Sequence, residues 1–314
     1  MPELSVLLPA RDAEATIARA VSSTLRALPP DAELVVLDDG STDATARVAR
    51  AAGRDDRRLR VVSGPPSGGL TRALDSLLGM TDSRLVARMD ADDLCLPWRF
   101  GTTLAAVERG EDMVFAQVVD LVGARPRPQA PVGIPPQTFP LHLLLTNPVS
   151  HPTMLARREL IDRVGGYRAV PAEDYDLWLR CAAAGARMRR VARWGLVYRV
   201  HPAQITASSN WRARSWADPD QAQAFADLSE RTVGRRLTRL VALQGLDPVE
   251  RAAGVEEFRR AVEPVVNAVG GVEGLRLRRR LRRRIHQVES CGSVPSDRPS
   301  TDDPGVPAGE EDLP

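Results

Sequence analysis

The chain has 314 residues, of which 43% are hydrophobic and 27% are charged, as in an ordinary globular protein. All 43 basic residues are arginine and 41 residues are acidic, and the resulting net charge of +2 excludes a polycation built for nucleic acid. The three cysteines lie far apart without metal-ligand spacing, which fits a reducing compartment. Because we find neither a signal peptide nor the run of about 20 apolar residues that spans a bilayer, we expect a cytoplasmic protein.

The first 110 residues alternate short apolar runs with segments whose apolar residues recur at helical spacing. This alternation predicts an α/β fold with a mostly parallel central sheet and helices on both faces, because parallel strands need helical crossovers. We expect Ser41 or Thr42 to cap the second helix, which ends near Ala52. The predicted strands are Leu4–Leu8, Leu34–Leu37, Leu59–Val62 and Leu85–Met89, and the other predicted helices are Ala13–Leu28, Leu70–Leu78 and Pro97–Arg109.

The rest of the chain predicts a second lobe, a helical extension and a tail. A Pro-rich stretch, Arg125–Pro140, is expected to be a mobile loop or a connection between lobes. Asp174–Ala184 is predicted to be a helix, Leu196–Val200 a strand, and residues 217–269 two or three helices. The expected domains are 1–210, with halves 1–110 and 111–210, then a helical extension over 211–288 and an acidic, Pro-rich disordered tail over 289–314.

A basic amphipathic helix is predicted at the end of this extension. Seven arginines and no acid lie between Leu275 and His286, around an apolar stripe. Three interpretations stay open: contact of residues 275–288 with an anionic membrane surface near a lipid-linked acceptor, binding to the acidic tail or an acidic partner, and a solvated helix. Nucleic acid is not an expected partner, because the run lacks interleaved aromatic residues. The stripe consists of Leu277, Leu281, Ile285 and Val288.

Two acidic clusters directly follow predicted strands. Asp38 and Asp39 follow the second strand, and the Asp-Ala-Asp-Asp segment 90–93 follows the fourth. Since ligands of parallel sheets bind beyond the carboxyl ends of the strands, both clusters should open onto the same edge of the sheet. Alternate carboxylates at a strand end point the same way and can converge on Mg²⁺ or Mn²⁺, and solvated turn acids are the alternative. We expect one acid of the first pair to hydrogen-bond a ligand edge such as a uracil imide or a ribose hydroxyl, and helix-capping or turn acids are the alternative for this pair.

Seven segments stand out for their order and spacing. They are Ser5–Asp12 (SVLLPARD), Val35–Asp43 (VVLDDGSTD), Ala87–Pro97 (ARMDADDLCLP), His151–Thr153 (HPT), Val164–Tyr167 (VGGY), Ala172–Arg180 (AEDYDLWLR) and Tyr198–His201 (YRVH). Taken together, they resemble the motifs of family 2 glycosyltransferases, which have the GT-A fold. The resemblance covers about residues 3–206 and does not extend to the C-terminal third of the chain.

The resemblance implies an inverting transfer of a sugar from a nucleotide-diphosphate sugar, with a UDP-sugar as the first expectation, to a hydroxyl of a glycan or lipid-linked glycan. It places a divalent metal, Mn²⁺ or Mg²⁺, on the diphosphate, and it suggests a role in cell-envelope, exopolysaccharide or glycolipid synthesis. The implied nucleotide-sugar residues are Pro9, Ala10, Arg11, Asp38, Asp39, Asp90 and Ala91. The implied metal ligands are Asp92 above all, Asp90 and His201, with Asp93 in support.

The same resemblance implies that Asp174 is the catalytic base, with Glu173 as the alternative. In-line displacement at the anomeric carbon needs such a base on the acceptor hydroxyl. The two acids also fit a pair that the macrodipole stabilises at a helix N-terminus, and both roles can hold. His151 and Trp178 are assigned to the acceptor side, where a structural histidine and a core tryptophan are the alternatives.

Two other functions compete with sugar transfer. A nucleotidyltransferase that makes nucleotide-sugars would also use a metal beside a parallel sheet, but it should carry a Gly-rich phosphate loop, and Pro9–Asp12 contains no glycine. A non-catalytic sensor or scaffold that binds nucleotide-sugars should lack the metal acids or the base, and Asp90, Asp92 and Asp174 are all present. Binding without turnover would distinguish this second rival from an enzyme.

Overall fold

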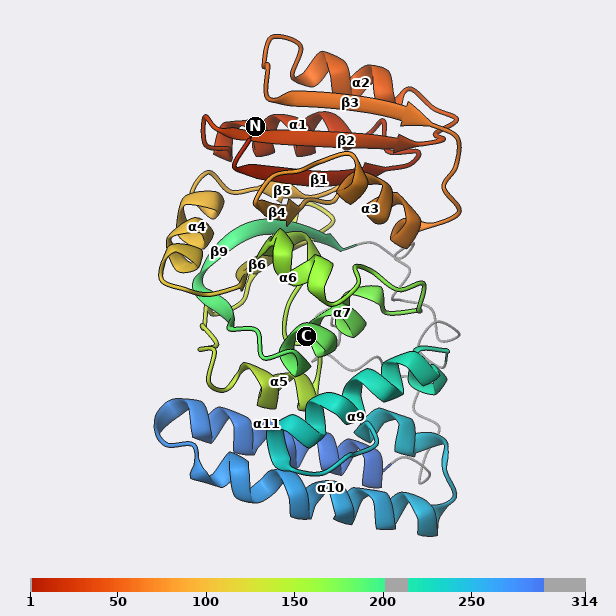
Figure 1. The fold of residues 1–314 in the computed structure, drawn as a ribbon, viewed down its shortest axis with the longest axis vertical. Coiled ribbons are helices and arrows are strands. Elements are labelled where there is room, and N and C mark those ends of the chain that lie inside the picture. The colour runs from red at the N-terminus through yellow and green to blue at the C-terminus, as the bar shows by residue number, and fades with distance from the viewer. Residues whose placement is uncertain (1, 201–213, 291–314) are drawn as a thin grey trace, which may run out of the picture. The chain divides into compact units, whose positions relative to one another are not determined.

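The computed structural model describes residues 2–200 and 214–290, which form two compact units (Figure 1). The first, here called the sheet unit, carries the β-sheet, and the second, the helical unit, is built from helices in its described part. The sheet unit comprises Met1–Pro136, Val149–Ala169 and Ala186–His201, and the helical unit comprises Gln137–Pro148, Val170–Gly185 and Pro202–Pro314.

Among the described residues, the sheet has nine strands in the order β3-β2-β1-β4-β8-β6-β9-β5, and β7 pairs with β6. Strands β3, β2, β1 and β4 are mutually parallel, as the sequence predicted. Beyond β4 the sheet is mixed, because β8 runs antiparallel to both β4 and β6. The strands are β1 Leu4–Ala10, β2 Ala32–Asp39, β3 Leu59–Gly64, β4 Leu85–Arg88, β5 Leu94–Cys95, β6 Met113–Val122, β7 Arg125–Pro128, β8 Leu155–Arg157 and β9 Met188–Val200.

Helices cover both faces of the parallel half of the sheet, since successive side chains of a strand point to opposite faces. Val6 of β1 joins a buried cluster with Ile17 of α1, whereas its neighbour Leu7 joins a second cluster with Ala73 and Leu77 of α3. The buried strands therefore read as continuous apolar runs. The helical elements of the sheet unit are α1 Ile17–Ala27, α2 Thr45–Ala52, α3 Leu70–Gly79, α4 Arg99–Glu108, η1 His151–Thr153 and α6 Arg158–Arg163.

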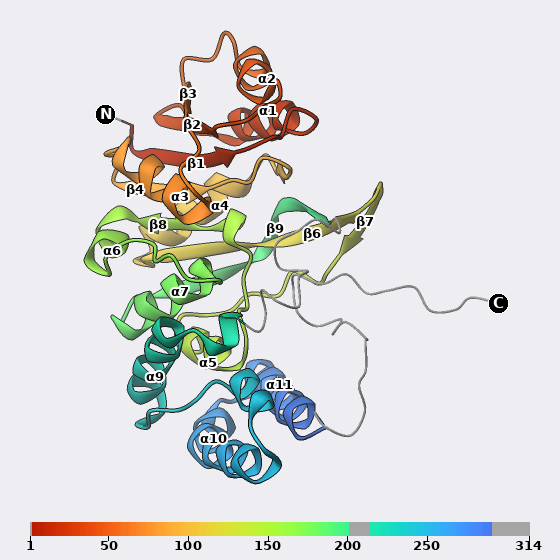
Figure 2. The ribbon, with the colours of Figure 1, turned by 90° about the vertical axis from the view of Figure 1, so that its right-hand side faces the viewer.

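The Pro-rich stretch after β6 is more ordered than expected. Arg125–Pro128 forms β7, which pairs antiparallel with the end of β6 in a hairpin (Figure 2). Proline fits this position because an edge strand leaves one row of backbone groups unpaired. Further along, Ile134 makes an isolated antiparallel bridge to Arg190. The stretch expected to be a mobile loop is thus a hairpin followed by a segment that is hydrogen-bonded to β9.

Strand β9 is also longer than the predicted Leu196–Val200, because it begins at Met188. Its first half carries arginines whose ends reach protein partners: Arg189 forms an ion pair with Glu111 at 2.7 Å, and Arg190 donates to the Val132 carbonyl. Long arginine stems can cover apolar surface while their charged ends find partners at the edge. An apolar-run criterion misses a strand of this composition.

The helical unit confirms the helices expected between residues 217 and 269. Asp218 and Asp247 cap α9 and α10, since each carboxylate accepts backbone N–H groups of the first turn. Proline follows each cap at the first helical position, where its missing N–H is not needed. The helical elements of this unit are α5 Phe139–Leu145, α7 Glu173–Ala183, α9 Pro219–Val233, η3 Leu240–Gly245, α10 Pro248–Ala268 and α11 Gly271–Glu289.

The basic helix predicted at the end of the extension is α11, and its apolar stripe is a core face. Leu277, Leu281, Ile285 and Val288 are at most 6% exposed, and α11 contacts α10, η3 and α5. The stripe is therefore not available for insertion into a membrane surface. Within residues 2–200 and 214–290, none of the helices combines the length and the apolarity needed to span a bilayer. From residue 291 onward, the predicted tail lies outside the described residues.

Candidate active site

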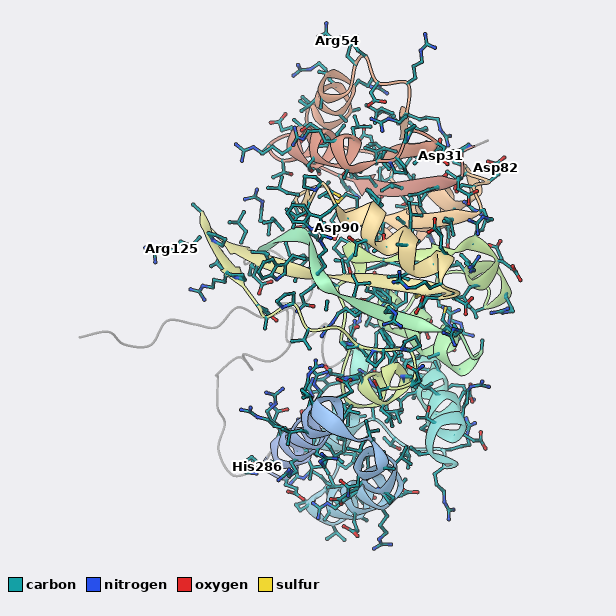
Figure 3. All side chains as sticks on the ribbon, turned by 90° about the vertical axis from the view of Figure 1, so that its left-hand side faces the viewer. Asp31, Arg54, Asp82, Asp90, Arg125 and His286 are labelled. Atoms are coloured by element: carbon teal, nitrogen blue, oxygen red, sulfur yellow. The ribbon has the colours of Figure 1, made fainter. Side chains whose placement is uncertain are left out.

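Three neighbouring parallel strands bring the predicted donor-side residues to one edge of the sheet unit. Pro9 and Ala10 end β1, Asp38 and Asp39 end β2, and the Asp-Ala-Asp-Asp segment 90–93 follows β4. Because β2 and β4 both pair with β1 in parallel, their carboxyl ends lie at the same edge, as predicted (Figure 3). Ligands of open α/β sheets bind at such an edge.

The three aspartates after β4 form a cluster. One carboxylate oxygen of each of Asp90, Asp92 and Asp93 lies within 4.8 Å of the others. Asp93 is 1% exposed; its Oδ1 accepts the Arg199 N–H at 2.8 Å, and its Oδ2 has no hydrogen-bond partner among the described residues. Burial, followed by the Asp90 and Asp92 carboxylates, raises the pKa of Asp93 well above its usual value.

A hard divalent cation would satisfy this cluster. Carboxylate oxygens are the ligands that Mg²⁺ and Mn²⁺ take, and among the described residues Oδ2 of buried Asp93 has no hydrogen-bond donor. The end of β9 holds the cluster from one side, because Arg199 donates its backbone N–H to Asp93 and its side chain to the Asp92 carbonyl. Tyr198 lies nearby, and burial and the three aspartates raise its pKa. His201, the remaining predicted ligand, lies outside the described residues.

A buried chain of polar side chains supports Asp90. Arg88 is 5% exposed, and its Nη2 lies 2.9 Å from Asp90 Oδ1, while its Nη1 contacts Nδ1 of His151. The other ring nitrogen of His151 lies 2.8 Å from the Tyr167 hydroxyl. Arg99, fully buried, donates to the Arg88 carbonyl at 2.6 Å. The structure thus gives Arg88 and Tyr167 roles that the sequence did not suggest.

The two residues assigned to the acceptor side are both buried. Both ring nitrogens of His151 contact protein groups, and one of them contacts Arg88, which pairs with Asp90. These contacts fit the alternative of a structural histidine. Trp178 of α7 is 0% exposed, and its ring belongs to the core, which was also the alternative. One signal for Arg88 was available: it precedes Asp90 by two residues, a spacing that places two side chains on the same side of an extended chain.

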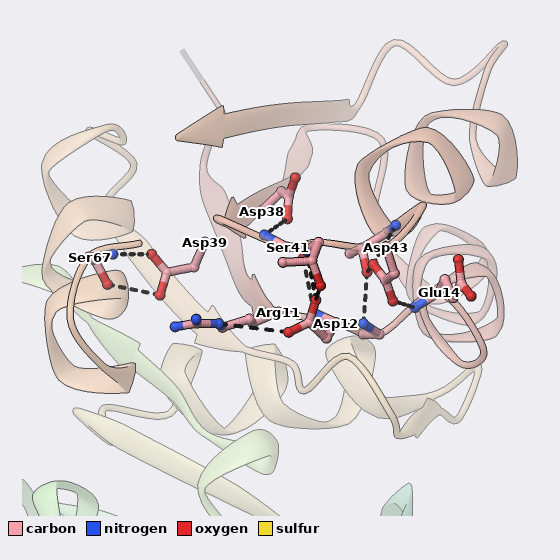
Figure 4. Close-up of polar contacts among 11 residues, drawn as sticks. Arg11, Asp12, Glu14, Asp38, Asp39, Ser41, Asp43 and Ser67 are labelled. Atoms are coloured by element: carbon pink, nitrogen blue, oxygen red, sulfur yellow. Dashed lines mark hydrogen bonds and ion pairs between the residues drawn. The ribbon is translucent and has the colours of Figure 1, made fainter. Parts of the chain in front are cut away.

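The nucleotide-side pair Asp38 and Asp39 is buried, and each carboxylate has a local partner (Figure 4). Asp38 Oδ1 accepts the Ser41 N–H at 3.2 Å, as a turn acid does. Asp39 accepts the backbone N–H of Ser67 at 2.6 Å and its hydroxyl at 3.0 Å. Gly40 has a φ of +71°, and a Cβ there would lie 2.5 Å from Pro66. Glycine is therefore required here by the fold as well.

The loops after β1 and β2 bind each other through side chains. The Asp12 N–H donates to Ser41 Oγ at 2.9 Å, and Asp12 Oδ1 accepts the Thr42 N–H at 2.8 Å (Figure 4). Asp12 itself has a φ of +47°, in the left-handed region that aspartate tolerates. Ser41 and Thr42 therefore do not cap α2, contrary to expectation. That helix begins at Thr45, whose backbone N–H donates to Asp43 Oδ1 at 2.9 Å.

The residues just before α1 also form hydrogen bonds with the loop after β2. Ala13 N–H donates to Thr45 Oγ1 at 2.7 Å, and Glu14 N–H donates to Asp43 Oδ2 at 3.0 Å. In return, Glu14 Oε2 accepts the Ala44 N–H at 2.9 Å. The predicted helix start at Ala13 is wrong, since α1 begins at Ile17, and Ala13 and Glu14 instead join the loop after β1 to the loop after β2. Arg11 precedes these contacts between the two loops. Its side chain is half exposed and lies 3.9 Å from the Asp12 carboxylate.

The proposed base lies in the helical unit, at the beginning of α7. Glu173, Asp174 and Asp176 all lie in the first turn, where the macrodipole favours acids. Asp176 is fully buried and paired with Arg180 at 2.8 Å, so its role is structural. Asp174 is partly exposed, and its Oδ2 accepts a hydrogen bond from Asn147 Nδ2 at 3.0 Å. A partly exposed carboxylate whose orientation is fixed by a hydrogen bond is suited to take a proton.

Comparison with known protein families gives a match over residues 5–165 to Glycosyl transferase family 2. The succinoglycan biosynthesis protein ExoU of Rhizobium meliloti is 31% identical over 223 residues, which are 66% of this chain and 64% of ExoU. The putative glycosyltransferase EpsE of Bacillus subtilis is 29% identical over 198 residues, which are 59% of this chain and 69% of EpsE. This chain thus spans slightly less than two thirds of the length of ExoU.

Solved structures show the same fold. TarS 1–349 of S. aureus, determined in complex with UDP-GlcNAc, superposes with a TM-score of 0.58 at 18% identity and covers 92% of this chain and 91% of its own. The mannosyltransferase PcManGT of Pyrobaculum calidifontis, determined with GDP-Man and Mn²⁺, gives a TM-score of 0.54 at 19% identity, covering 88% and 79%. These likenesses confirm the predicted GT-A architecture.

Proposed function

Because this chain belongs to glycosyl transferase family 2, we propose that it transfers a sugar from a nucleotide-diphosphate sugar to a hydroxyl acceptor, with inversion at the anomeric carbon. The observation that carries the proposal is the cluster of Asp90, Asp92 and Asp93, with its buried unpartnered oxygen, at the carboxyl edge of a parallel sheet. A nucleotidyltransferase would also need a Gly-rich phosphate loop, and the loop after β1 has none.

The donor would lie along this edge. Asp92 and Asp90, with Asp93 in support, would hold Mn²⁺ or Mg²⁺, which when bound supplies positive charge to the diphosphate. Asp39, held by Ser67, and the exposed Arg11 would contact the nucleoside. A UDP-sugar is the proposed donor. The solved structures of the same fold in complex with UDP-GlcNAc and GDP-Man support a nucleotide-sugar in general.

Asp174 would accept the proton of the acceptor hydroxyl as that oxygen attacks the anomeric carbon, and the nucleoside diphosphate would leave from the opposite face. Its hydrogen bond from Asn147 supports this role over Glu173. We propose a glycan or lipid-linked glycan acceptor in exopolysaccharide or cell-envelope synthesis. The likeness to ExoU, which is named for succinoglycan biosynthesis, supports that class.

A cytoplasmic location and peripheral contact with an anionic membrane remain predictions. The predicted contact depends on those arginines of α11 that are exposed. Of the seven arginines of α11, Arg276, Arg278, Arg280 and Arg284 donate to protein groups within the helical unit. Arg279 and Arg282 are exposed, and each arginine near an anionic surface contributes about 1 kcal/mol. Cosedimentation with vesicles containing an anionic phospholipid tests this contact, and no binding at low salt would exclude it.

The experiment for the proposed function is a thermal-shift screen against UDP, GDP, dTDP and CDP, each with and without Mn²⁺. A ligand that binds only the folded protein raises its melting temperature by mass action. We expect one nucleotide to stabilise the protein only with metal, and its sugar conjugates then to be cleaved. Metal-dependent binding without any turnover would favour the non-catalytic sensor instead.

A further inference from the structure

The hydrogen bond from Asn147 to Asp174 fixes one side of the carboxylate proposed as the base. Asn147 Nδ2 donates to Oδ2 at 3.0 Å, and the Tyr175 N–H lies 2.6 Å from Oδ1. An amide NH₂ group can only donate, so Asn147 favours the ionised form of the carboxylate and cannot itself take the proton. The orientation of Asp174 therefore depends on where the backbone places Asn147.

Asn147 lies two residues after the end of α5, and this end is fixed from two directions. Tyr175 of α7 donates its hydroxyl to the Leu143 carbonyl at 2.5 Å. From α11, Arg284 donates Nε to the Leu145 carbonyl at 3.1 Å and Nη2 to Thr146 Oγ1 at 2.6 Å. The last carbonyls of a helix lack intrahelical donors, and a cation there is stabilised by the dipole. Arg284 thus holds the two residues that precede Asn147.

The beginning of α5 is bound to the same helix. Glu273 of α11 lies 2.6 Å from His142 Nε2 and accepts the Thr138 hydroxyl at 3.1 Å. Arg280 donates to His142 Nδ1 at 3.0 Å. His142 is 1% exposed, so these contacts are shielded from water. Together with the buried apolar stripe, they make α11 a support along the length of α5.

We propose that the C-terminal helix α11 positions the catalytic base: Arg284 holds the end of α5 so that Asn147 orients Asp174 for proton transfer. Asn147 and Arg284 are positioning residues: Asn147 acts through the Asp174 carboxylate, and Arg284 acts through the residues that precede Asn147. The inference rests on the proposed role of Asp174. It assigns Arg280 and Arg284 a purpose within the enzyme, because these two arginines donate to α5 and to the residue that follows it.

The test compares Asn147→Ala, Arg284→Gln and Arg284→Lys with Arg282→Gln, a matched control that removes one exposed arginine from the same helix. The assay follows UDP or GDP release from UDP-glucose, UDP-GlcNAc and GDP-mannose with Mn²⁺ and water as acceptor. We expect kcat to fall about 10- to 100-fold for Asn147→Ala, in the range of a misplaced general base. Arg284→Gln should lose less, and Arg284→Lys should recover part, since lysine cannot donate from two fixed nitrogens.

A structural defect alone would not reproduce the remaining readouts. The KM for the donor should stay within about twofold, and the acid limb of the kcat profile should move to higher pH, because a carboxylate that loses a donor binds a proton more readily. If Arg284→Gln fails to fold, Thr146→Val removes one of its contacts and leaves α11 intact. Wild-type kcat and pH profile in Asn147→Ala would overturn the inference.

Failure of the proposed function gives a different result. If Asp174→Asn retains the wild-type rate, the assignment of the base is wrong, and the positioning inference fails with it. If Asp174→Asn is inactive and Asn147→Ala is normal, only the positioning inference fails. Absence of turnover in the wild-type protein with all three donors would count against both.

Discussion

At the residue scale, the contacts of His151 indicate which of its ring nitrogens accepts a hydrogen bond. Arginine can only donate, so the Arg88 contact requires Nδ1 of His151 to be the acceptor. The proton of the neutral ring then lies on Nε2 and is donated to the Tyr167 oxygen. Arg88 thus contacts His151 through one guanidinium nitrogen and Asp90 through another. The imidazole thereby helps to position the guanidinium that pairs with Asp90, a proposed metal ligand.

Replacing His151 should therefore weaken donor binding. His151→Phe keeps a ring of similar volume but removes the acceptor from buried Arg88, so Asp90 loses its fixed partner. We expect the Kd for UDP with Mn²⁺ to rise roughly tenfold, equivalent to about 1.4 kcal/mol, by isothermal titration calorimetry. Tyr167→Phe, which removes only the far end of the chain, should change it less than about threefold. Equal affinities for His151→Phe and the wild type would contradict this account.

Asp12 offers a second prediction at this scale, on stability. Its side chain accepts from Thr42 and its backbone has a φ of +47°, so alanine loses both the acceptor and the tolerance for this conformation. We expect Asp12→Ala to lower the free energy of unfolding by about 1–2 kcal/mol and Asp12→Asn to stay within about 0.5 kcal/mol. Urea unfolding of both variants measures this difference. A loss of the same size in Asp12→Asn would show that charge, not the hydrogen bond, holds the two loops together.

At the element scale, the contact between α5 and α11 is sensitive to pH. Burial, together with the Arg280 guanidinium, lowers the pKa of His142 to about 4 against the opposing effect of Glu273. An unfolded histidine titrates near 6.5, so between about 6.5 and 4 the unfolded chain binds a proton that the folded chain excludes. The stabilising effect of neutral His142 is therefore complete above pH 6.5 and is lost as the pH falls through this range.

We expect His142 to contribute a slope of up to about 1.4 kcal/mol per pH unit to unfolding between pH 6.5 and 4. Glutamine at this position can donate to Glu273 and accept from Arg280 without titrating, so His142→Gln serves as the matched variant. Chemical denaturation at several pH values gives the difference between the two proteins. If His142→Gln loses stability on acidification as steeply as the wild type, the histidine is not the group that titrates.

The sequence predicts elements well where burial leaves an apolar run. Strands β1, β2 and β4 are runs of this kind, and the acids that the sequence placed on one edge lie at the end of β2 and directly after β4. The prediction fails where arginines cover buried surface, as at Arg189 and Arg190 in β9. Periodicity also could not reveal what the stripe of α11 contacts. The link between Arg88 and His151 joins residues 63 positions apart, and no local pattern reports such a contact.

At the scale of the whole molecule, the proposed chemistry is divided between the two units. The aspartate cluster belongs to the sheet unit, and Asp174 with its Asn147 partner belongs to the helical unit. The family match ends at residue 165, before Asp174. The assignment of the base therefore depends on a motif and a hydrogen bond outside the matched segment, whereas the assignment of the donor edge lies within it.

Truncation tests whether the C-terminal helix α11 is part of the core of the helical unit. Deleting residues 275–314 removes the buried side chains of α11, each worth about 1.5–3 kcal/mol, so the helical unit should melt at a lower temperature or fail to fold. Deleting residues 291–314 leaves α11 intact and serves as the control, with an unchanged melting temperature. Differential scanning calorimetry of both proteins measures this effect. Equal melting temperatures would contradict the view that α11 is part of the core.

The most direct measurement of the central claim is metal-dependent binding and turnover in the full chain and in two variants. The wild type should bind a nucleoside diphosphate with Mn²⁺ and release it from the matching nucleotide-sugar. Asp92→Asn should lose the effect of Mn²⁺ on binding, because a metal ligand is removed, and Asp174→Asn should bind normally but lose turnover. If Asp92→Asn binds and turns over as the wild type does, the donor site proposed at the carboxyl edge of the sheet is wrong.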